Sequence, residues 1–223
     1  MLTLHTAELL VPGPGAAPLP GGAVLVEGDR IARVGPFADI AADCPHARAR
    51  RWPGVLTPGL LVRGGDALLE RTYYPDDPYE VTELGADPIS GAAELEALKM
   101  TEARWGNSAR RGTQKLLARG VVAVTGRFTI PAVRTAVVRS GLTVLPPAAS
   151  TPTPSLDPPP DFVRGDPHAG RDAAEQAFYG VLEPGAPARF AVFAAEDPQA
   201  LLARGATSCV ATVIGGRLLH RRR

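Results

Sequence analysis

The chain has 223 residues, of which 45% are hydrophobic and 21% are charged, and its formal net charge is +1. This length can bury a substantial core, in one domain or in two small ones. The near-zero charge gives no electrostatic reason to expect nucleic acid or a membrane surface as a partner.

Three features of the sequence bear on the cellular compartment. Cys44 and Cys209 are far apart and in no metal-type spacing, which favours two free thiols in a reducing compartment. The first residues do not combine a basic segment with an apolar run, so no signal peptide is expected. No apolar stretch approaches the length of a membrane span. We therefore expect a cytoplasmic protein.

The first quarter of the chain is typical of a small β-module. Short apolar segments are separated there by glycine and proline, which favour turns. Gly28-Asp29 predicts a tight turn between two antiparallel strands. The expected elements are strands over Leu2–Val11, Ala23–Glu27 and Ile31–Val34, a helical turn over Ala38–Ala42 and a short strand over Ala47–Trp52.

The middle of the chain alternates helices that end at glycine with short, fully apolar strands. This order is a βαβ signature, and such strands are typical of a parallel sheet that is buried on both faces. The expected elements are a strand over Leu60–Val62, a helix from an N-cap at Ser90 to Gly120 with a break or bend at Gly106–Ser108, a strand over Val121–Thr125, a helix over Ala132–Ser140 and a strand over Leu142–Leu145.

The segment Thr72–Glu80 combines tyrosines and acidic residues on a loop that prolines interrupt. One interpretation is a binding loop, with Tyr73, Tyr74, Tyr79 and Glu80 as candidate ligand-binding residues for a small molecule. The other is an ordinary surface loop with aromatic anchors. The sequence alone leaves both open.

The last third begins with a proline-dense segment, Pro146–Pro167, which predicts a stiff linker or wrapping arm. A helix is expected over Ala169–Tyr179. Two further strand regions follow, Phe190–Phe193 and Val210–Leu219. Neither end of the chain can bury its apolar strand faces alone, so we expect the strands of both ends to share one sandwich.

Both ends of the sequence, and its middle in part, resemble the amidohydrolase superfamily, and its imidazolonepropionase-like branch in particular. The resemblance rests on Gly22–Gly35, on the Pro58-Gly59 turn before Leu60, and on the Leu182-Glu183-Pro184-Gly185 turn before the strand at Phe190. It implies an α+β fold, with a composite β-sandwich from both chain termini and a truncated (β/α) barrel remnant of two to three βα units. The implied domains are 1–57 with 180–223 as the sandwich, 58–145 as the βα region, and 146–179 as a proline-rich arm and return helix.

The resemblance also implies a catalytic metal, held by a His-x-His pair after the first barrel strand. Gly64 and Asp66 occupy those positions here. Asp66 to Gly170 spans 105 residues, whereas a complete barrel needs roughly 250. The four histidines are not at ligand spacing. We therefore expect no metal cofactor, with zinc as the alternative. Catalytic residues stay unknown, and the weak candidates are Asp66, Asp76, Asp77 and His168.

Three functions follow from this resemblance. The first is a pseudoenzyme that has lost metal-dependent catalysis and serves as a binding or accessory protein. The second is a divergent hydrolase that acts on carbon–nitrogen bonds other than peptide bonds. The third is a structural partner whose open half-barrel is completed by a second chain. Because an open parallel remnant leaves an apolar strand edge bare, we also expect a homodimer.

Overall fold

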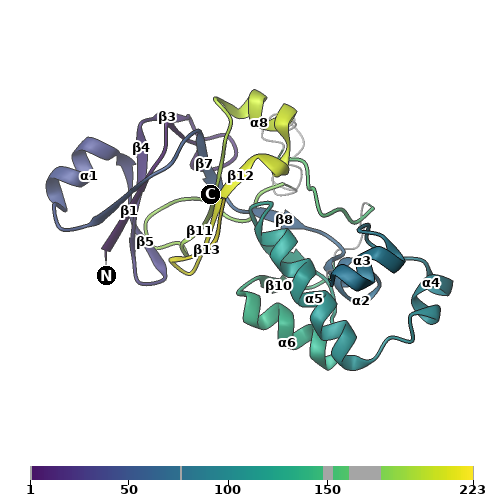
Figure 1. Ribbon diagram of the computed structural model, residues 1–223. Helices are drawn as coiled ribbons and strands as arrows, with labels where there is room; N and C mark the ends of the chain where they lie inside the picture. The colour runs from purple at the N-terminus through teal and green to yellow at the C-terminus, as the bar shows by residue number, and fades with distance from the viewer. Residues whose placement is uncertain (1, 76, 148–152, 161–176, 223) are drawn as a thin grey trace. The chain divides into compact units, whose positions relative to one another are not determined.

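The computed structural model describes residues 2–75, 77–147, 153–160 and 177–222 (Figure 1). The chain forms two compact units. The first contains residues 1–61, 117–122 and 157–223, and the second contains residues 62–116 and 123–156. Helices and strands are mixed in a fold of the α+β class, as the sequence predicts. No helix in the described ranges is both long and apolar enough to cross a membrane.

The first unit contains a four-stranded sheet built from the N-terminal part of the chain. Its order is β5-β4-β1-β6, with β6 parallel to β1 and the other pairs antiparallel. The helix α1 (Phe37–Asp43) places Ile40 in an apolar cluster with Leu4 and Leu25 on one face. The strands are β1 (Leu2–Thr6), β4 (Gly22–Glu27), β5 (Arg30–Pro36) and β6 (Arg48–Arg51).

The second sheet of this unit has six strands and brings both ends of the chain together. Its order is β13-β12-β11-β7-β2-β3, and β7 pairs antiparallel with β11. The short helices α8 (Pro198–Arg204) and η1 (Ala206–Ser208) connect β11 to β12. The strands are β2 (Leu9–Leu10), β3 (Leu19–Pro20), β7 (Val55–Pro58), β11 (Arg189–Phe193), β12 (Cys209–Ile214) and β13 (Arg217–Arg221).

One apolar cluster contains residues of both sheets, and we call it the shared core. Val24 and Ile31 come from the four-stranded sheet, while Leu56, Phe190 and Val213 come from the six-stranded sheet. Each of these side chains is at most 1% exposed. Burying a large aliphatic or aromatic side chain stabilises the folded state by about 1.5–3 kcal/mol. The strands of the two chain ends therefore depend on each other for burial.

The expected single strand Leu2–Val11 is wrong. The chain divides there into β1 and β2, which belong to different sheets. The Thr6 hydroxyl donates to the carbonyl oxygen of Gly22 at 3.0 Å, and the backbone N–H of Ala7 donates to the same oxygen at 3.3 Å. After this point the chain crosses to β7, where the N–H of Val11 donates to Leu56 at 2.9 Å. A continuous apolar pattern does not reveal that its residues have two different partners.

A three-stranded sheet has the order β10-β9-β8, and β9 is parallel to β10. Its strands are β8 (Leu60–Val62), β9 (Val121–Thr125) and β10 (Thr143–Leu145). The first two begin in the first unit and end in the second. The helix α6 (Pro131–Ser140) connects β9 to β10. These are the strands that the βαβ pattern predicts.

The helices of the second unit depart from the prediction in the position of the break and in the N-cap. A break is present, but it lies between α4 (Ala92–Ala97) and α5 (Glu102–Leu117), where Lys99 has a φ of 48°. Gly91, and not Ser90, is the N-cap of α4. The other helices are α2 (Gly65–Glu70) and α3 (Pro78–Leu84).

Close packing explains why α5 runs through its glycines. A Cβ atom on Gly112 would lie 2.5 Å from Cδ2 of Leu69 and 2.8 Å from Cε2 of Tyr74. A Cβ atom on Gly106 would lie 3.1 Å from that of Ala132. These glycines therefore let neighbouring elements approach α5 and do not end it. Glycine in a helix costs about 1 kcal/mol relative to alanine, and tertiary packing can offset this cost.

The two edges of the three-stranded sheet differ. A segment near Phe178 covers the free edge of β8, because the N–H of Leu61 donates to Ala177 at 3.0 Å and the N–H of Tyr179 donates to Gly59 at 2.8 Å. No strand in the described residues pairs with the outer edge of β10, and Val144 on that strand is 44% exposed. The expectation of a buried strand over Leu142–Leu145 is wrong for this residue. Most of the expected helix Ala169–Tyr179 lies outside the described residues.

Candidate functional site

The end of β8 is where the family resemblance places a metal pair. Gly64 has φ 68° and ψ 39°, in the left-handed region, and is the N-cap of α2. Its N–H donates to Oγ1 of Thr125 at 3.2 Å. Asp66 lies in the first turn of α2, and its carboxylate accepts a hydrogen bond from Nη2 of Arg71 at 2.9 Å. The strand therefore ends in a residue without a side chain and an acid that is paired with an arginine.

These residues do not fit a catalytic zinc ion. Such an ion requires about three converging nitrogen, sulfur or oxygen ligands. In the described ranges no group of three histidine, cysteine, aspartate or glutamate side chains is arranged to hold a metal. His5 lies in β1, His46 is exposed in a loop and His220 lies in β13. Asp76 and His168 lie outside the described residues.

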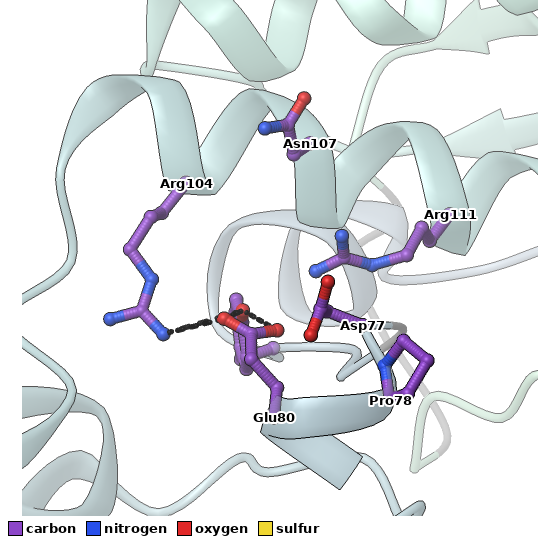
Figure 2. A pocket seen from close by; sticks show the side chains of 7 residues that line it. Asp77, Pro78, Glu80, Arg104, Asn107 and Arg111 are labelled. Atoms are coloured by element: carbon purple, nitrogen blue, oxygen red, sulfur yellow. Dashed lines mark hydrogen bonds and ion pairs between the residues drawn. The ribbon is translucent and has the colours of Figure 1, made fainter.

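A hollow of about 440 Å³ lies between α3 and α5 in the second unit, and we call it the α3–α5 hollow (Figure 2). Arg104, Asn107 and Arg111 face it from α5, because residues at spacings of three and four share one face of a helix. Asp77 caps α3, and its Oδ1 accepts from the N–H of Tyr79 at 2.8 Å. The lining residues are Tyr73, Asp77, Pro78, Glu80, Arg104, Asn107 and Arg111.

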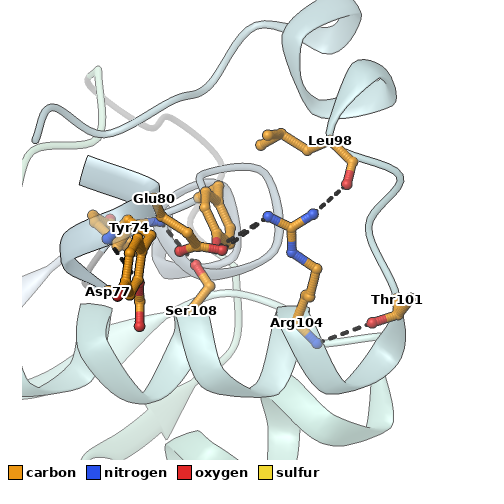
Figure 3. Close-up of polar contacts among 9 residues, drawn as sticks. Tyr74, Asp77, Glu80, Leu98, Thr101, Arg104 and Ser108 are labelled. Atoms are coloured by element: carbon orange, nitrogen blue, oxygen red, sulfur yellow. Dashed lines mark hydrogen bonds and ion pairs between the residues drawn. The ribbon is translucent and has the colours of Figure 1, made fainter. Parts of the chain in front are cut away.

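One side of the hollow is fixed by a hydrogen-bonded group of three side chains. The Tyr73 hydroxyl lies 2.6 Å from both carboxylate oxygens of Glu80. Figure 3 shows the contact between Arg104 and Glu80, in which Nη2 of Arg104 lies 3.0 Å from Oε1 of Glu80. Nη2 of Arg104 also lies 3.4 Å from the Tyr73 hydroxyl. The hydrogen bond with Tyr73, followed by that with Glu80, raises the pKa of Arg104. Glu80 is thus occupied as an acceptor and is not a free general base.

The other side of the hollow contains Arg111. Its guanidinium carbon lies 5.5 Å from the ring centroid of Tyr73, and that of Arg104 lies 5.1 Å from the same ring. Nε of Arg111 is buried and has no hydrogen-bond partner in the described residues. Figure 2 shows the Asp77 carboxylate near Arg111, but no ion pair within 4 Å joins these two described side chains. Among the described residues, Arg111 is therefore a positive charge without an ion-pair partner.

The candidate residues of the Thr72–Glu80 segment lie in different environments in the structure. Tyr73, Glu80 and Asp77 line the hollow. Tyr74 is 1% exposed, and its hydroxyl donates to the carbonyl oxygen of Leu68 at 2.8 Å, so it is a core residue whose pKa is raised by burial. Tyr79 is 84% exposed and does not line the hollow.

Sequence reasoning missed the contribution of α5. Arg104, Asn107 and Arg111 carry a detectable signal, because their spacing places polar groups on one helical face. That signal is also typical of any solvated helix face. Only the position of α3 across from α5 turns these side chains into the wall of a hollow.

Comparison with known proteins finds one family and several structures. Residues 22–43, which contain β4, β5 and α1, match the imidazolonepropionase-like composite domain of bacteria. No curated protein matches the sequence. The chain is similar to ochratoxinase from A. niger, with 26% identity over 64% of this chain and 30% of that chain, and a TM-score of 0.45.

Two deaminases are similar over a comparable region. An adenosine deaminase from Xanthomonas campestris, solved with bound zinc, has 20% identity over 64% of this chain and 33% of that chain, and a TM-score of 0.44. E. coli guanine deaminase has 12% identity over 65% of this chain and 36% of that chain, and a TM-score of 0.46.

The chain therefore spans about a third of the length of these structures, with shares of 30% to 36%. The family match falls on the β4–β5 hairpin, which is one of the segments that carry the resemblance in the sequence. The resemblance recognised in the sequence is confirmed to this extent: residues 22–43 match the imidazolonepropionase-like composite domain of bacteria.

Proposed function

We propose that this chain is an amidohydrolase-like protein that has lost metal-dependent catalysis and serves as a binding or accessory protein. One observation carries this proposal. At the end of β8, where the family's metal pair would lie, Gly64 has no side chain and Asp66 is paired with Arg71. In this proposal the two sheets of the first unit are the family's composite β-sandwich, and the three-stranded sheet is the remnant of its barrel.

The α3–α5 hollow is the proposed binding site. Its volume of about 440 Å³ lies within the range of roughly 300–1,000 Å³ that is usual for small-molecule sites. Arg111 offers a guanidinium fork, which matches the geometry of a carboxylate. Asp77 offers an acceptor on the same side of the hollow (Figure 2). The proposed ligand is a small molecule that carries both a carboxylate and an N–H group, as an amino acid does.

Arg111→Gln is expected to weaken binding of such a ligand by about ten- to a hundred-fold. A hydrogen bond to a charged group contributes roughly 1.5–3 kcal/mol, which corresponds to that factor. The measurement is isothermal titration with the free proteinogenic amino acids as probes. Arg110→Gln is the matched control, because Arg110 is the exposed neighbour on the same helix and does not line the hollow. Failure of every amino acid to bind, or equal affinity for Arg111→Gln and the parent chain, would contradict the proposed ligand class.

A homodimer is proposed through the outer edge of β10. Val144 on this strand is 44% exposed, and Val138 on the preceding helix is 69% exposed. An unpaired, apolar strand edge favours association with a second strand. Light scattering at micromolar concentration is expected to give twice the mass of one chain. Val144→Lys is expected to shift the protein to a single-chain mass, since charge on an edge strand opposes pairing. A monomer at every concentration in the parent chain would exclude this dimer.

A further inference from the structure

The first unit contains two edge strands that are rich in arginine. β6 is the edge of the four-stranded sheet, and β13 is the edge of the six-stranded sheet. The sequence of β6 is Arg48-Ala49-Arg50-Arg51, and β13 ends at Arg221. These arginines do not line the α3–α5 hollow, whose lining residues all belong to the second unit.

The register of the strands turns three of these arginines toward one side. Arg50 is the partner of His5 on β1, and the His5 ring lies 4.9 Å from that of Phe190 in the shared core. Residues paired across a ladder point to the same face, as do residues two apart on one strand, so Arg48 shares this direction. Arg221 is the partner of Ala211, which also belongs to the shared core.

Contacts around Trp52 confirm that the two edges come together. The guanidinium carbon of Arg221 lies 5.9 Å from the centroid of the Trp52 ring, and Nε1 of Trp52 donates to Nδ1 of His5 at 3.2 Å. Burial, followed by the charges of Arg48 and Arg221, lowers the pKa of Arg50. The positive charges of Arg48, Arg50 and Arg221, which come from two sheets, therefore lie close together beside the shared core.

Among the described residues, no acid neutralises the charges of these three arginines. In the part of the chain that the structure describes, no carboxylate lies within 4 Å of the guanidinium groups of Arg48, Arg50 or Arg221. Nε of Arg50 is buried and has no hydrogen-bond partner in the same residues. Arg33, on the opposite edge strand of the same sheet, shows the usual arrangement, because its Nη1 lies 2.7 Å from Oδ2 of Asp43.

Protection of the strand edges against aggregation does not explain why Arg48, Arg50 and Arg221 lie together. Single charges on an edge strand oppose aggregation without cost to the fold. Here the charges of two edges converge and repel one another, and repulsion between like charges destabilises the unliganded protein. A bound anion would remove this repulsion and would satisfy the buried Nε of Arg50.

We propose that Arg48, Arg50 and Arg221 form a binding site for a small anion that carries two or more phosphate groups. The planar guanidinium fork binds phosphate oxygens in pairs, and three forks match the charge of a di- or triphosphate better than that of a monovalent anion. The near-zero net charge of the chain and the small extent of the group favour a small anion over a nucleic acid. This site is independent of the proposed function of the α3–α5 hollow.

Thermal denaturation with sodium tripolyphosphate, against sodium chloride at equal ionic strength, tests this site. At a hundred-fold excess over Kd the triphosphate is expected to raise Tm by roughly 5–10 °C more than the chloride. Arg50→Gln combined with Arg221→Gln is expected to abolish this rise and to increase Tm in the absence of the anion, because the repulsion is lost. Arg33→Gln, the control, is expected to keep the full rise.

Either of two results would overturn the proposal. One is a rise in Tm no larger than that with chloride, and the other is an unchanged rise in the double variant. Arg48→Gln provides a second measurement that does not depend on the folding of the double variant, since Arg48 is exposed. Isothermal titration of this variant with tripolyphosphate is expected to show affinity at least about ten-fold weaker than that of the parent chain. Unchanged affinity would likewise exclude the site.

Discussion

Gly54→Ala is expected to lower the free energy of unfolding by about 3 kcal/mol, through strain and overpacking. Gly54 has a φ of 77°, which alanine adopts at a cost. A Cβ atom there would lie 2.2 Å from the carbonyl oxygen of Phe193 and 2.8 Å from that of Ala195. These are backbone atoms, which cannot rotate away. The collision is expected to weaken the pairing between the two chain ends, because Val55 on β7 is the partner of Phe193 on β11.

Gly28→Ala is the matched control for this prediction. Gly28 has a φ of 62°, but no atom lies within 4 Å of the position of its Cβ. It therefore carries the backbone strain without the collision, and the expected loss is about 1 kcal/mol. Thermal unfolding followed by circular dichroism is expected to show a fall in Tm of roughly 6–12 °C for Gly54→Ala, against roughly 2–4 °C for the control. Equal losses would mean that the backbones of β7 and β11 do not approach each other as described.

Acidification from pH 6.5 to pH 4.5 is expected to cost the protein about 2–3 kcal/mol of stability through His5 alone. This side chain is 1% exposed and lies between the rings of Trp52 and Phe190. Burial, together with the nearby charge of Arg50, lowers its pKa from 6.5 to about 3. Between these two values the unfolded chain binds a proton that the folded chain does not. The stability is thus complete above pH 6.5 and falls as the pH decreases toward 3.

Urea denaturation of the parent chain and of His5→Gln across this pH range measures the effect. The parent chain is expected to lose about 1.4 kcal/mol more per pH unit than the variant, which lacks the group. His220, whose pKa is also lowered, remains in both proteins and cancels in the comparison. His46→Gln serves as the control, because His46 is exposed, and it is expected to keep the slope of the parent chain. Parallel curves for the parent chain and His5→Gln would show that His5 is not a buried neutral group.

Sequence patterns predicted the elements whose residues are neighbours along the chain. The β4–β5 hairpin follows from alternating residues and Gly28, and the β9-α6-β10 unit follows from short apolar strands and a helix that ends at Gly141. The division of the first apolar segment into β1 and β2 was not predictable, because both halves have the same composition and differ only in their partners. Gly112 could not be interpreted from sequence for a related reason. Its role depends on Leu69 and Tyr74, which pack against it.

The candidate site was predictable only in part. Tyr73 and Glu80 were found because aromatic and acidic residues are concentrated on one loop. Tyr74 and Tyr79 have the same chemistry in the sequence, yet one is buried and the other is exposed. Tyr79 lies in the first turn of α3, whereas Tyr74 is held by hydrogen bonds with Leu68 and Ser108, and the sequence does not say which of the two faces solvent. Arg111 lies 38 residues after Tyr73, so its position beside the Tyr73 ring depends on tertiary packing, which local sequence patterns do not reveal.

The metal content of the purified chain is the most direct test of the central claim, the loss of metal-dependent catalysis. The protein would be expressed with added zinc, dialysed, and measured by elemental analysis. The absence of a ligand pair at Gly64 and Asp66 predicts far less than one zinc or iron ion per chain. It also predicts that Gly64→His with Asp66→His creates no hydrolysis of carbon–nitrogen bonds, because no third ligand is arranged near them in the described residues. About one ion per chain, retained through dialysis, would contradict the claim.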